Sequence, residues 1–338
     1  MRVLIIGGAG FIGSNYAARR LAAGDEVVVF DNLSRPKTEL NLEWLRSRHG
    51  SKLAFITGDV RDYQAVAQAT AGAGAVVHLA GQVAVTTSVA NPREDFEVNA
   101  LGTFNVLEAV RHGAPDAAVL FASTNKVYGG LEDVVVEEQR TRHMFRDLPD
   151  GVAESHPLDF HSPYGCSKGA ADQYVRDYAR VYGMRTVVFR QSCIYGTRQF
   201  GVEDQGWVAH FCISAALGRP ITIYGDGKQV RDVLWIDDLL NAYDLALGHL
   251  DVASGQIFNV GGGPANIMSI WAEFEPLLRP MVKGPLEVQY REARVGDQKV
   301  YVSNIDKARR ELGWEPKVSV QEGVERLWNW VSANRDLF

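Results

Sequence analysis

The chain has 338 residues, which exceeds the usual size of one domain (about 100–200 residues) and predicts one large domain or two lobes. Hydrophobic residues make up 46% and charged residues 22%, so the composition excludes wholesale disorder. The net charge of −6 and the lack of any basic run exclude an electrostatic footprint for nucleic acid.

Neither a membrane segment nor a disulfide framework is predicted. No apolar stretch approaches the ~20 residues of a membrane span, and the short apolar run before the first glycines is too brief for a signal peptide. The cysteines, Cys166, Cys193 and Cys212, form no CxxC and no ladder of pairs. We therefore expect a soluble cytoplasmic protein without a metal site or a membrane partner.

The first half of the chain alternates short apolar runs with longer helical patterns. Stretches such as Ile12–Ala23 and Phe96–His112 repeat apolar residues at three- and four-residue spacing, which is typical of helices. Continuous apolar runs suit strands buried on both faces of a parallel sheet. The pattern predicts a doubly wound parallel α/β domain of the Rossmann type. The predicted strands are Val3–Ile6, Glu26–Phe30, Leu53–Ile56, Ala75–Leu79, Ala118–Ala122 and Thr186–Phe189.

Beyond about Gln191 the segments become shorter and carry Gly and Pro turn signals. A final amphipathic helix is predicted over Val320–Ala333. The stretch Trp235–Leu250 is expected to return to the first domain. We therefore expect residues 1–190, with about 235–260, to form the Rossmann domain, and residues 191–234 and 261–338 to form a smaller α/β lobe.

A glycine-rich turn joins the first predicted strand to the first predicted helix. It reads Gly7-x-x-Gly10-Phe11-Ile12-Gly13, and also GxGxxG from the glycine after Gly7. Small residues let the backbone approach a pyrophosphate, and the helix N-terminus supplies free N–H groups. Because a strand precedes the glycines and a helix follows them, the motif predicts a dinucleotide site.

The pair Asp31-Asn32 closes the second predicted strand, 18 residues after the last of these glycines. A carboxylate there accepts from a ribose 2′-hydroxyl and repels a 2′-phosphate, so NAD is favoured over NADP. Arg35 keeps NADP as the alternative. Asp59-Val60 follows the third strand, where Asp59 is either an adenine contact or a helix cap.

Tyr164 and Lys168 stand four residues apart, and Pro163 suits the start of a helix, so that phenol and ammonium share one face. Ser123 and Thr124 end the preceding strand, at the sheet edge where α/β proteins bind ligands. A cation beside a phenol favours the ionised form that acts as a base. Hydroxyl, phenol and ammonium beside a nicotinamide predict a hydride-transfer site.

Together these motifs resemble the extended short-chain dehydrogenase/reductase family of nucleotide-sugar enzymes, over essentially the whole chain. The stretches that carry the resemblance are the glycine run, the Asp31 segment, His78-Leu79-Ala80-Gly81, Asn99 with Gly102-Thr103, Ser123-Thr124 with Val127-Tyr128-Gly129, and Tyr164-x3-Lys168. Those that match the family's second lobe are Gly225-Asp226-Gly227, Gln229, Arg231-Asp232, Arg294 and Leu312-Gly313-Trp314-x-Pro316.

The resemblance implies that the first domain binds NAD and that the smaller lobe binds a nucleotide sugar. Tyr164 would be the base, Lys168 would lower its pKa, and Thr124 would bond the reacting oxygen. The cofactor residues implied are Gly7, Gly10, Phe11, Ile12, Gly13, Asp31, Asn32, Asp59, Val60, Leu79, Ala80, Gln82, Asn99, Ser123, Tyr164 and Lys168. The substrate residues implied are Thr86, Ser88, Thr124, Asn125, Lys126, Arg231 and Arg294, the two arginines for the diphosphate.

One departure within the family narrows the expected reaction. Dehydratases of the family have Thr-Asp-Glu at the strand end, whereas this chain has Thr124-Asn125-Lys126, which lacks the carboxyl groups that elimination needs. Several stretches, including 81–88, 158–164 and 204–208, resemble the branch that epimerises CDP-linked hexoses at C2. The alternatives are a UDP-hexose 4-epimerase, a sugar dehydrogenase that releases NADH, and a non-enzymatic NAD-binding regulator. The family also implies a homo-oligomer, either a dimer or a tetramer, with Phe96–His112 and Tyr164–Tyr182 as the helices that often pair.

Overall fold

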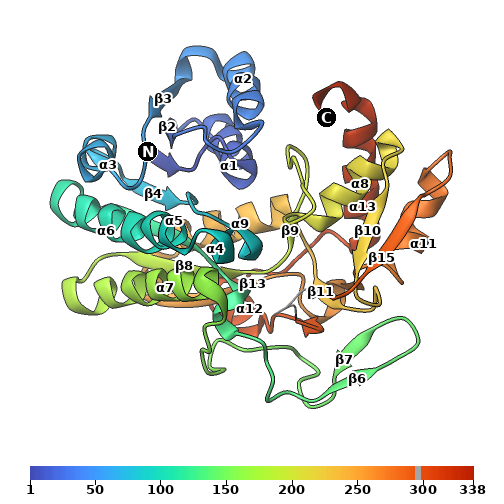
Figure 1. Cartoon of the computed structure of the whole chain (residues 1–338). Coiled ribbons are helices and arrows are strands. Elements are labelled where there is room, and N and C mark those ends of the chain that lie inside the picture. The colour runs from blue at the N-terminus through green and yellow to red at the C-terminus, as the bar shows by residue number, and fades with distance from the viewer. Residues whose placement is uncertain (294–297) are drawn as a thin grey trace. The chain divides into compact units, whose positions relative to one another are not determined.

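The largest sheet of the structure, a computed structural model that describes residues 1–293 and 298–338, has seven strands (Figure 1). Its strand order is β13-β8-β5-β4-β1-β2-β3, and β1 pairs in parallel with both β2 and β4. The predicted fold class is confirmed, and the six predicted strands all lie in this sheet. The strands are β1 (Arg2–Ile6), β2 (Glu26–Asp31), β3 (Leu53–Thr57), β4 (Ala75–His78), β5 (Ala118–Thr124), β8 (Thr186–Gln191) and β13 (Gln256–Val260).

Helices cover both faces of this sheet, which explains why its strands are apolar without alternation. On one face, α3 (Tyr63–Thr70), α6 (Gly102–Gly113) and α7 (Ser162–Tyr182) pack against the strands in one hydrophobic cluster. The other face carries α1 (Phe11–Ala22), α2 (Thr38–His49) and α9 (Ile236–Gly248), where the rings of Tyr16, Phe189 and Tyr243 meet. The short α10 (Leu250–Ala253) leads into β13.

The predicted helix Phe96–His112 is interrupted in the structure. The chain forms α4 (Val85–Ala90) and α5 (Pro92–Phe96), then a π-helical turn over Glu97–Leu101, and only then α6. A π-turn inserts one extra residue into a helix and often marks a functional site. It places Asn99 on the buried side of the helix.

The remaining elements form several small sheets and helices. Helix α13 (Val320–Ala333) has the bounds that the sequence predicted. The other helices are α8 (Trp207–Leu217), α11 (Phe274–Leu278) and α12 (Asp306–Leu312), with 3₁₀ turns at 50–52, 125–128, 264–266, 279–281 and 335–337. The strands are β6 (Val136–Glu138), β7 (His143–Phe145), β9 (Ile194–Tyr195), β10 (Ile221–Tyr224), β11 (Val230–Asp232), β12 (Leu234–Trp235), β14 (Ile267–Ser269), β15 (Val288–Arg291) and β16 (Val300–Tyr301).

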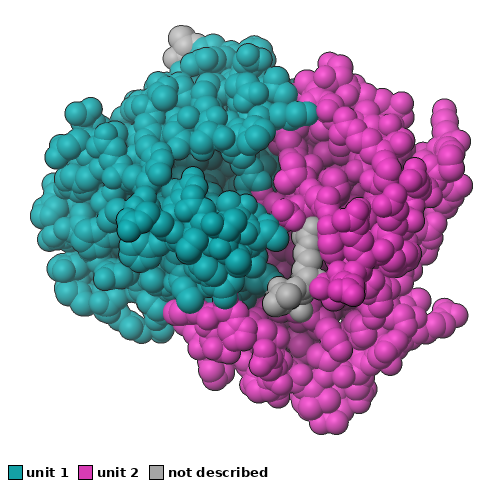
Figure 2. Space-filling view, viewed as in Figure 1, with its two compact units in different colours: residues 1–127, 162–190, 240–258 teal, residues 128–161, 191–239, 259–338 magenta. Residues whose placement is uncertain are grey.

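The chain divides into two compact units (Figure 2). Unit 1 comprises residues 1–127, 162–190 and 240–258, and unit 2 comprises residues 128–161, 191–239 and 259–338. Residues 128–161, which the sequence grouped with the first domain, belong to unit 2. They are held there because Arg142 pairs with Glu273 at 2.6 Å and the His143 N–H donates to the Lys228 carbonyl.

All three cysteines are free thiols. Over residues 1–293 and 298–338, no helix is both long and apolar enough to span a membrane.

Candidate active site

The glycine turn between β1 and α1 is built for close backbone approach. Gly7 has φ +81°, and a Cβ there would lie 2.6 Å from the Ala80 nitrogen. A Cβ on Gly13 would strike the Gly7 carbonyl oxygen, whereas one on Gly10 would meet nothing closer than 3.3 Å. Gly7 therefore makes the turn, Gly13 lets α1 lie against the turn, and Gly10 leaves the helix N-terminus open to a ligand.

Asp31 connects β2 to this turn. One carboxylate oxygen accepts from the Ala9 N–H at 3.0 Å and the other from the Leu33 N–H at 2.9 Å. Burial raises the pKa of the Asp31 carboxyl, and these backbone hydrogen bonds oppose the rise. The carboxylate thus has a fixed orientation beside the glycines, as a ribose acceptor requires.

Asp59 is not a helix cap, because Asp62 accepts the N–H groups of Gln64 and Ala65 at the start of α3. Asp59 instead accepts from Arg61 at 2.7 Å and from the Asn32 amide at 2.9 Å. The hydrogen bonds from Arg61 hold its pKa at about 2. The structure thus brings Asn32 and Asp59 together at the ends of neighbouring strands β2 and β3.

Asn99 fixes the loop that follows β4. Its side chain accepts from the Gln82 N–H and donates to the Gln82 carbonyl, both at 3.0 Å. The N–H groups of Leu79 and Ala80 donate to the Ile6 carbonyl, so this loop is tied to β1 as well. These predicted cofactor residues therefore share one edge of the sheet with the glycine turn.

Tyr164 and Lys168 lie one turn apart near the start of α7, and both are buried. Lys168 Nζ donates to the Ala122 carbonyl at 2.7 Å and lies 4.2 Å from the centroid of the Phe121 ring. The Thr124 hydroxyl is hydrogen-bonded to the Tyr164 phenol. The structure thus brings the three predicted catalytic residues together in unit 1.

Burial dominates the protonation of this group. It raises the pKa of Tyr164 to about 12, where the hydrogen bond from Thr124 lowers it and the charge of Asp95 raises it. Burial also lowers the pKa of Lys168 to about 8, against the carboxylates of Asp172 and Asp95. The sequence-based expectation was that Lys168 would ease ionisation of the phenol. In the protein alone, desolvation dominates and the pKa of Tyr164 lies above its ordinary value, with no contribution from Lys168 among its causes.

The hydroxyl of Ser123 has a partner that the sequence did not suggest. It donates to Asp172 at 2.7 Å, and Asp172 also accepts two hydrogen bonds from Arg190, each 3.0 Å long. All three side chains are buried. Ser123 therefore links β5 to α7, because its hydroxyl proton is used in the hydrogen bond to Asp172.

The predicted substrate residues have different surroundings. Asn125 is buried next to Thr124, and the Lys126 N–H donates to the Thr124 hydroxyl at 3.2 Å. Thr86 is exposed on α4, whereas Ser88 is buried and donates to the Val85 carbonyl of its own helix.

The two arginines predicted for the diphosphate belong to the second half of the chain. Arg231 is buried on β11 of unit 2, where its Nη1 donates to the Val230 carbonyl at 2.8 Å. Arg294 lies outside the described residues.

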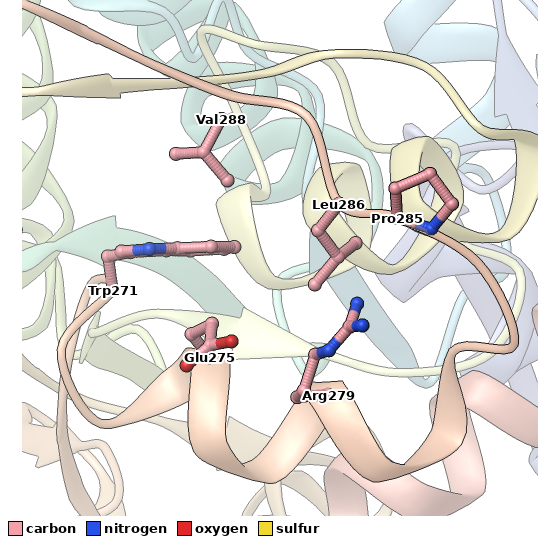
Figure 3. Close-up of a pocket in the computed structure, with 6 residues that line it drawn as sticks. All are labelled: Trp271, Glu275, Arg279, Pro285, Leu286 and Val288. Carbon is pink, nitrogen blue, oxygen red and sulfur yellow. The ribbon is translucent and has the colours of Figure 1, made fainter.

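Unit 2 also carries an open pocket of about 340 Å³ that contains none of the predicted residues. Figure 3 shows the Trp271 ring on one side of it and Glu275 and Arg279, from the α11 segment, below. The lining residues are Trp271, Glu275, Arg279, Pro285, Leu286 and Val288. Within the described part of the chain, no group of three His, Cys, Asp or Glu side chains could hold a metal ion.

Comparison with known proteins bears on the chemistry of this site. The family model described as GDP-mannose 4,6 dehydratase matches residues 4–327. The CDP-paratose 2-epimerase of Salmonella typhi is 45% identical, over 98% of this chain and 100% of that protein. The UDP-glucose 4-epimerase of Thermotoga maritima, solved with UDP-glucose, superposes with a TM-score of 0.84 at 30% identity and covers 99% of this chain and 100% of its own. The Thermus thermophilus UDP-glucose 4-epimerase, solved with NAD, gives 0.82 at 33% identity, over 99% and 100% of the two chains.

Proposed function

Because the chain belongs to the extended short-chain dehydrogenase/reductase family of nucleotide-sugar epimerases and dehydratases, we propose that it epimerises a CDP-linked hexose at C2. The reaction would be of the type that interconverts CDP-paratose and CDP-tyvelose, in the cytoplasm. The nucleobase of the substrate, cytosine, and the sugar carbon that is inverted, C2, are both proposed from the similarity to the Salmonella typhi 2-epimerase.

The observation that carries the proposal is the tripeptide Thr124-Asn125-Lys126, at the end of β5 and beside Tyr164. Elimination of water needs an acid and a base, and the dehydratases that this chain resembles have two carboxyl groups in these places for those roles. An amide and an ammonium group stand in those two places here. Epimerisation through a ketone needs no such pair, because one base can take and return the same proton.

The residues at the edge of the sheet suit NAD. Gly10 leaves the N-terminus of α1 open for the diphosphate, and the oriented carboxylate of Asp31 suits a ribose without a 2′-phosphate. When bound, NAD supplies the acceptor and donor of hydride that a redox-neutral inversion requires. We propose that the other predicted cofactor residues of unit 1 also hold NAD. They include Asn32 and Asp59 after β2 and β3, and Gln82 and Asn99 at the loop after β4.

The chain's own groups move the proton. Tyr164 takes the proton of the C2 hydroxyl as C2 becomes a ketone, and Thr124 stabilises the phenolate by donating to it. Lys168 supplies a buried positive charge next to the reaction. The 2-keto sugar would turn over in the site, so that hydride returns to the opposite face of C2 while Tyr164 returns the proton to the oxygen. The sugar then leaves with C2 inverted and no net oxidation. We propose Arg231 and Arg294 for the diphosphate and Thr86, Ser88, Asn125 and Lys126 for the sugar.

We further propose that the protein works as a homo-oligomer through the outer face of α6 and α7. This face exposes large apolar side chains, which include Phe104 (38% exposed), Tyr174 (49%) and Tyr182 (51%). The rings of Phe104 and Tyr174 bridge the two helices, with centroids 6.0 Å apart. A second copy of the same face would cover these rings.

Proton NMR of the purified protein with CDP-paratose, CDP-glucose and UDP-glucose in turn, with no added NAD, tests the reaction. We expect conversion of a CDP-hexose to its C2 epimer by cofactor carried through purification. Conversion of UDP-glucose to its C4 epimer would overturn the 2-epimerase proposal and favour the 4-epimerase. Bound NAD with no turnover of any of the three sugars would favour the regulator.

A further inference from the structure

A buried carboxylate lies next to the catalytic group and has no part in the chemistry described above. Asp95, on the short helix α5, has no exposed surface. One of its oxygens accepts from the Ser167 hydroxyl at 2.5 Å and the other from the Asn99 amide at 3.1 Å. Burying a carboxylate costs free energy unless hydrogen bonds or a nearby positive charge compensate for its lost hydration.

Its two partners belong to the two halves of the predicted site. Ser167 lies on α7 between Tyr164 and Lys168, and its hydroxyl is also 3.2 Å from the Tyr164 carbonyl. Asn99 holds the backbone of Gln82, in the loop after β4. The Asn99 amide also donates to the Ser167 hydroxyl at 3.1 Å. Asp95 therefore joins the catalytic turn of α7 to the loop proposed to hold the cofactor.

Asp95 differs from Asp172, the other buried carboxylate near Lys168, in having no arginine as an ion-pair partner among the described residues. Asp172 is paired with Arg190, and its charge also acts on Lys168. Among the described residues, no lysine, arginine or histidine nitrogen lies within 4.0 Å of the Asp95 carboxylate, whose hydrogen-bond donors are neutral. Its field therefore acts on the groups just beyond its partners, which are Lys168 and Tyr164.

We propose that Asp95 is a positioning residue for the epimerase reaction: through Ser167 it fixes the turn that carries Tyr164 and Lys168, and its negative charge adds to that of Asp172 in keeping the buried Lys168 protonated. The assignment rests on the proposed roles of Tyr164 and Lys168. Asp95 acts through its hydrogen bonds to Ser167 and Asn99 and through its charge, so removing the carboxylate should lower the pKa of Lys168.

The sign of the expected effect follows from the charge. Burial raises the pKa of Asp95, and its hydrogen bonds and Lys168 oppose the rise. Replacing Asp95 by Asn removes a negative charge, so the pKa of Lys168 falls further below its usual value and the pKa of Tyr164 falls as well. The other charged group on Lys168, Asp172, is unchanged in this variant, and burial holds His78 neutral with a pKa of about 3.

The test is an NMR titration of Lys168 in protein labelled with ¹³C at lysine Cε, with the signal identified by Lys168→Arg. In Asp95→Asn we expect the pKa of Lys168 to fall by about half a unit to one unit. Ser167→Ala keeps the carboxylate and should leave this pKa near the wild-type value. Glu94→Gln removes an exposed carboxylate from the same helix and is the matched control.

The pH profile of kcat/KM is the second measurement. Both shifts point to lower pH, so the whole profile of Asp95→Asn should move that way, whereas Ser167→Ala should lose kcat by about 3- to 10-fold without moving it. An unmoved Lys168 titration in Asp95→Asn, or an equal shift in Glu94→Gln, overturns the proposal. Because the titration needs no substrate, its result is independent of whether the proposed epimerase activity exists.

Discussion

At Tyr164, burial, the hydrogen bond from Thr124 and the charge of Asp95 together set how easily the phenol ionises. Burial raises its pKa to about 12, and the hydrogen bond from Thr124 lowers it. A base is most efficient when its pKa lies near the working pH, so the protein alone leaves the phenol far from that optimum. The positive charge of oxidised NAD would favour the phenolate. This coupling suits an enzyme whose base ionises after the cofactor is in place.

Removing the Thr124 hydroxyl should therefore change the pH dependence of kcat/KM. In Thr124→Ala the hydrogen bond that favours the phenolate is lost, so the pKa of Tyr164 rises and the acid limb of kcat/KM moves to higher pH. We expect a shift of about one unit and a loss of kcat of about 10- to 100-fold. Thr124→Ser keeps the hydroxyl and should restore both values to near wild type. The measurement is the initial rate of C2 epimerisation between pH 6 and 10.

Tyr164→Phe completes this test, because it removes the proposed base but keeps the buried ring. A rate within ten-fold of wild type in Tyr164→Phe would show that another group is the base. If Thr124→Ser stayed as impaired as Thr124→Ala, the hydroxyl would not be acting on Tyr164.

Local spacing was enough to predict that Tyr164 and Lys168 share one helix face, but not which buried groups support them. Tyr164 and Lys168 lie four residues apart, which any helix places on one face. Asp95 stands between Glu94 and Phe96 on a short helix, and in sequence it resembles a surface acid. Its burial depends on contacts with residues about 70 positions away, such as Ser167. Asp172 and Arg190 escaped prediction for the same reason, since their pairing arises only when α7 packs on β8.

At the scale of elements, the β1–α1 turn shows how a glycine pattern fixes a contact. Gly13 lies in the first turn of α1, and an added Cβ would strike the Gly7 carbonyl oxygen and lie 2.6 Å from the Gly8 Cα. Both obstacles are backbone atoms, which cannot rotate away. The helix would have to move from the turn, and the proposed diphosphate site would move with it.

We expect Gly13→Ala to lower the free energy of unfolding by about 2–3 kcal/mol and to abolish copurification of NAD. Urea unfolding and the nucleotide released by heating the protein measure the two effects. Gly248→Ala is the matched control, because a Cβ at Gly248, the last residue of α9, meets nothing within 4 Å. It should change stability by less than about 1 kcal/mol and retain NAD. Full NAD content in Gly13→Ala would contradict the assigned role of the turn.

The sequence predicted which segments form helices and strands more reliably than it predicted which of them pack together. The six buried strands followed from continuous apolar runs, and α13 from its apolar stripe. The seventh strand, β13, was not predicted, although residues up to about 260 were placed with the first domain. Its sequence, Gln256–Val260, contains Asn259, whose amide donates to the Val152 carbonyl. The π-turn at Glu97–Leu101 leaves no mark on apolar spacing, since it shifts the helix by a single residue.

For the whole molecule, the exposed apolar side chains are unevenly distributed. Those on α4 to α7 include Val89 (64% exposed), Phe96 (58%) and Val181 (61%), in addition to the rings of Phe104 and Tyr174. Single exposed apolar residues are normal on a protein surface, but a gathering of aromatic rings on two adjacent helices supports the proposed self-association through this face. A two-fold axis would bring the same face of a second copy against it, so that each ring covers its counterpart.

Tyr174 offers a direct test of this assembly. We expect the wild type to sediment as a dimer or tetramer of the 37.3 kDa chain at micromolar concentration. A carboxylate at the centre of an apolar interface is costly to bury, so Tyr174→Glu should weaken association at least about 30-fold and release monomers. Tyr290→Glu, at a tyrosine of β15 that is 60% exposed in unit 2, is the matched control and should leave the assembly intact. A monomeric wild type, or equal dissociation in both variants, would show that α6 and α7 do not form the contact. Because Tyr164, Lys168 and their supports all lie in unit 1 of one chain, we expect the Tyr174→Glu monomer to keep its bound NAD.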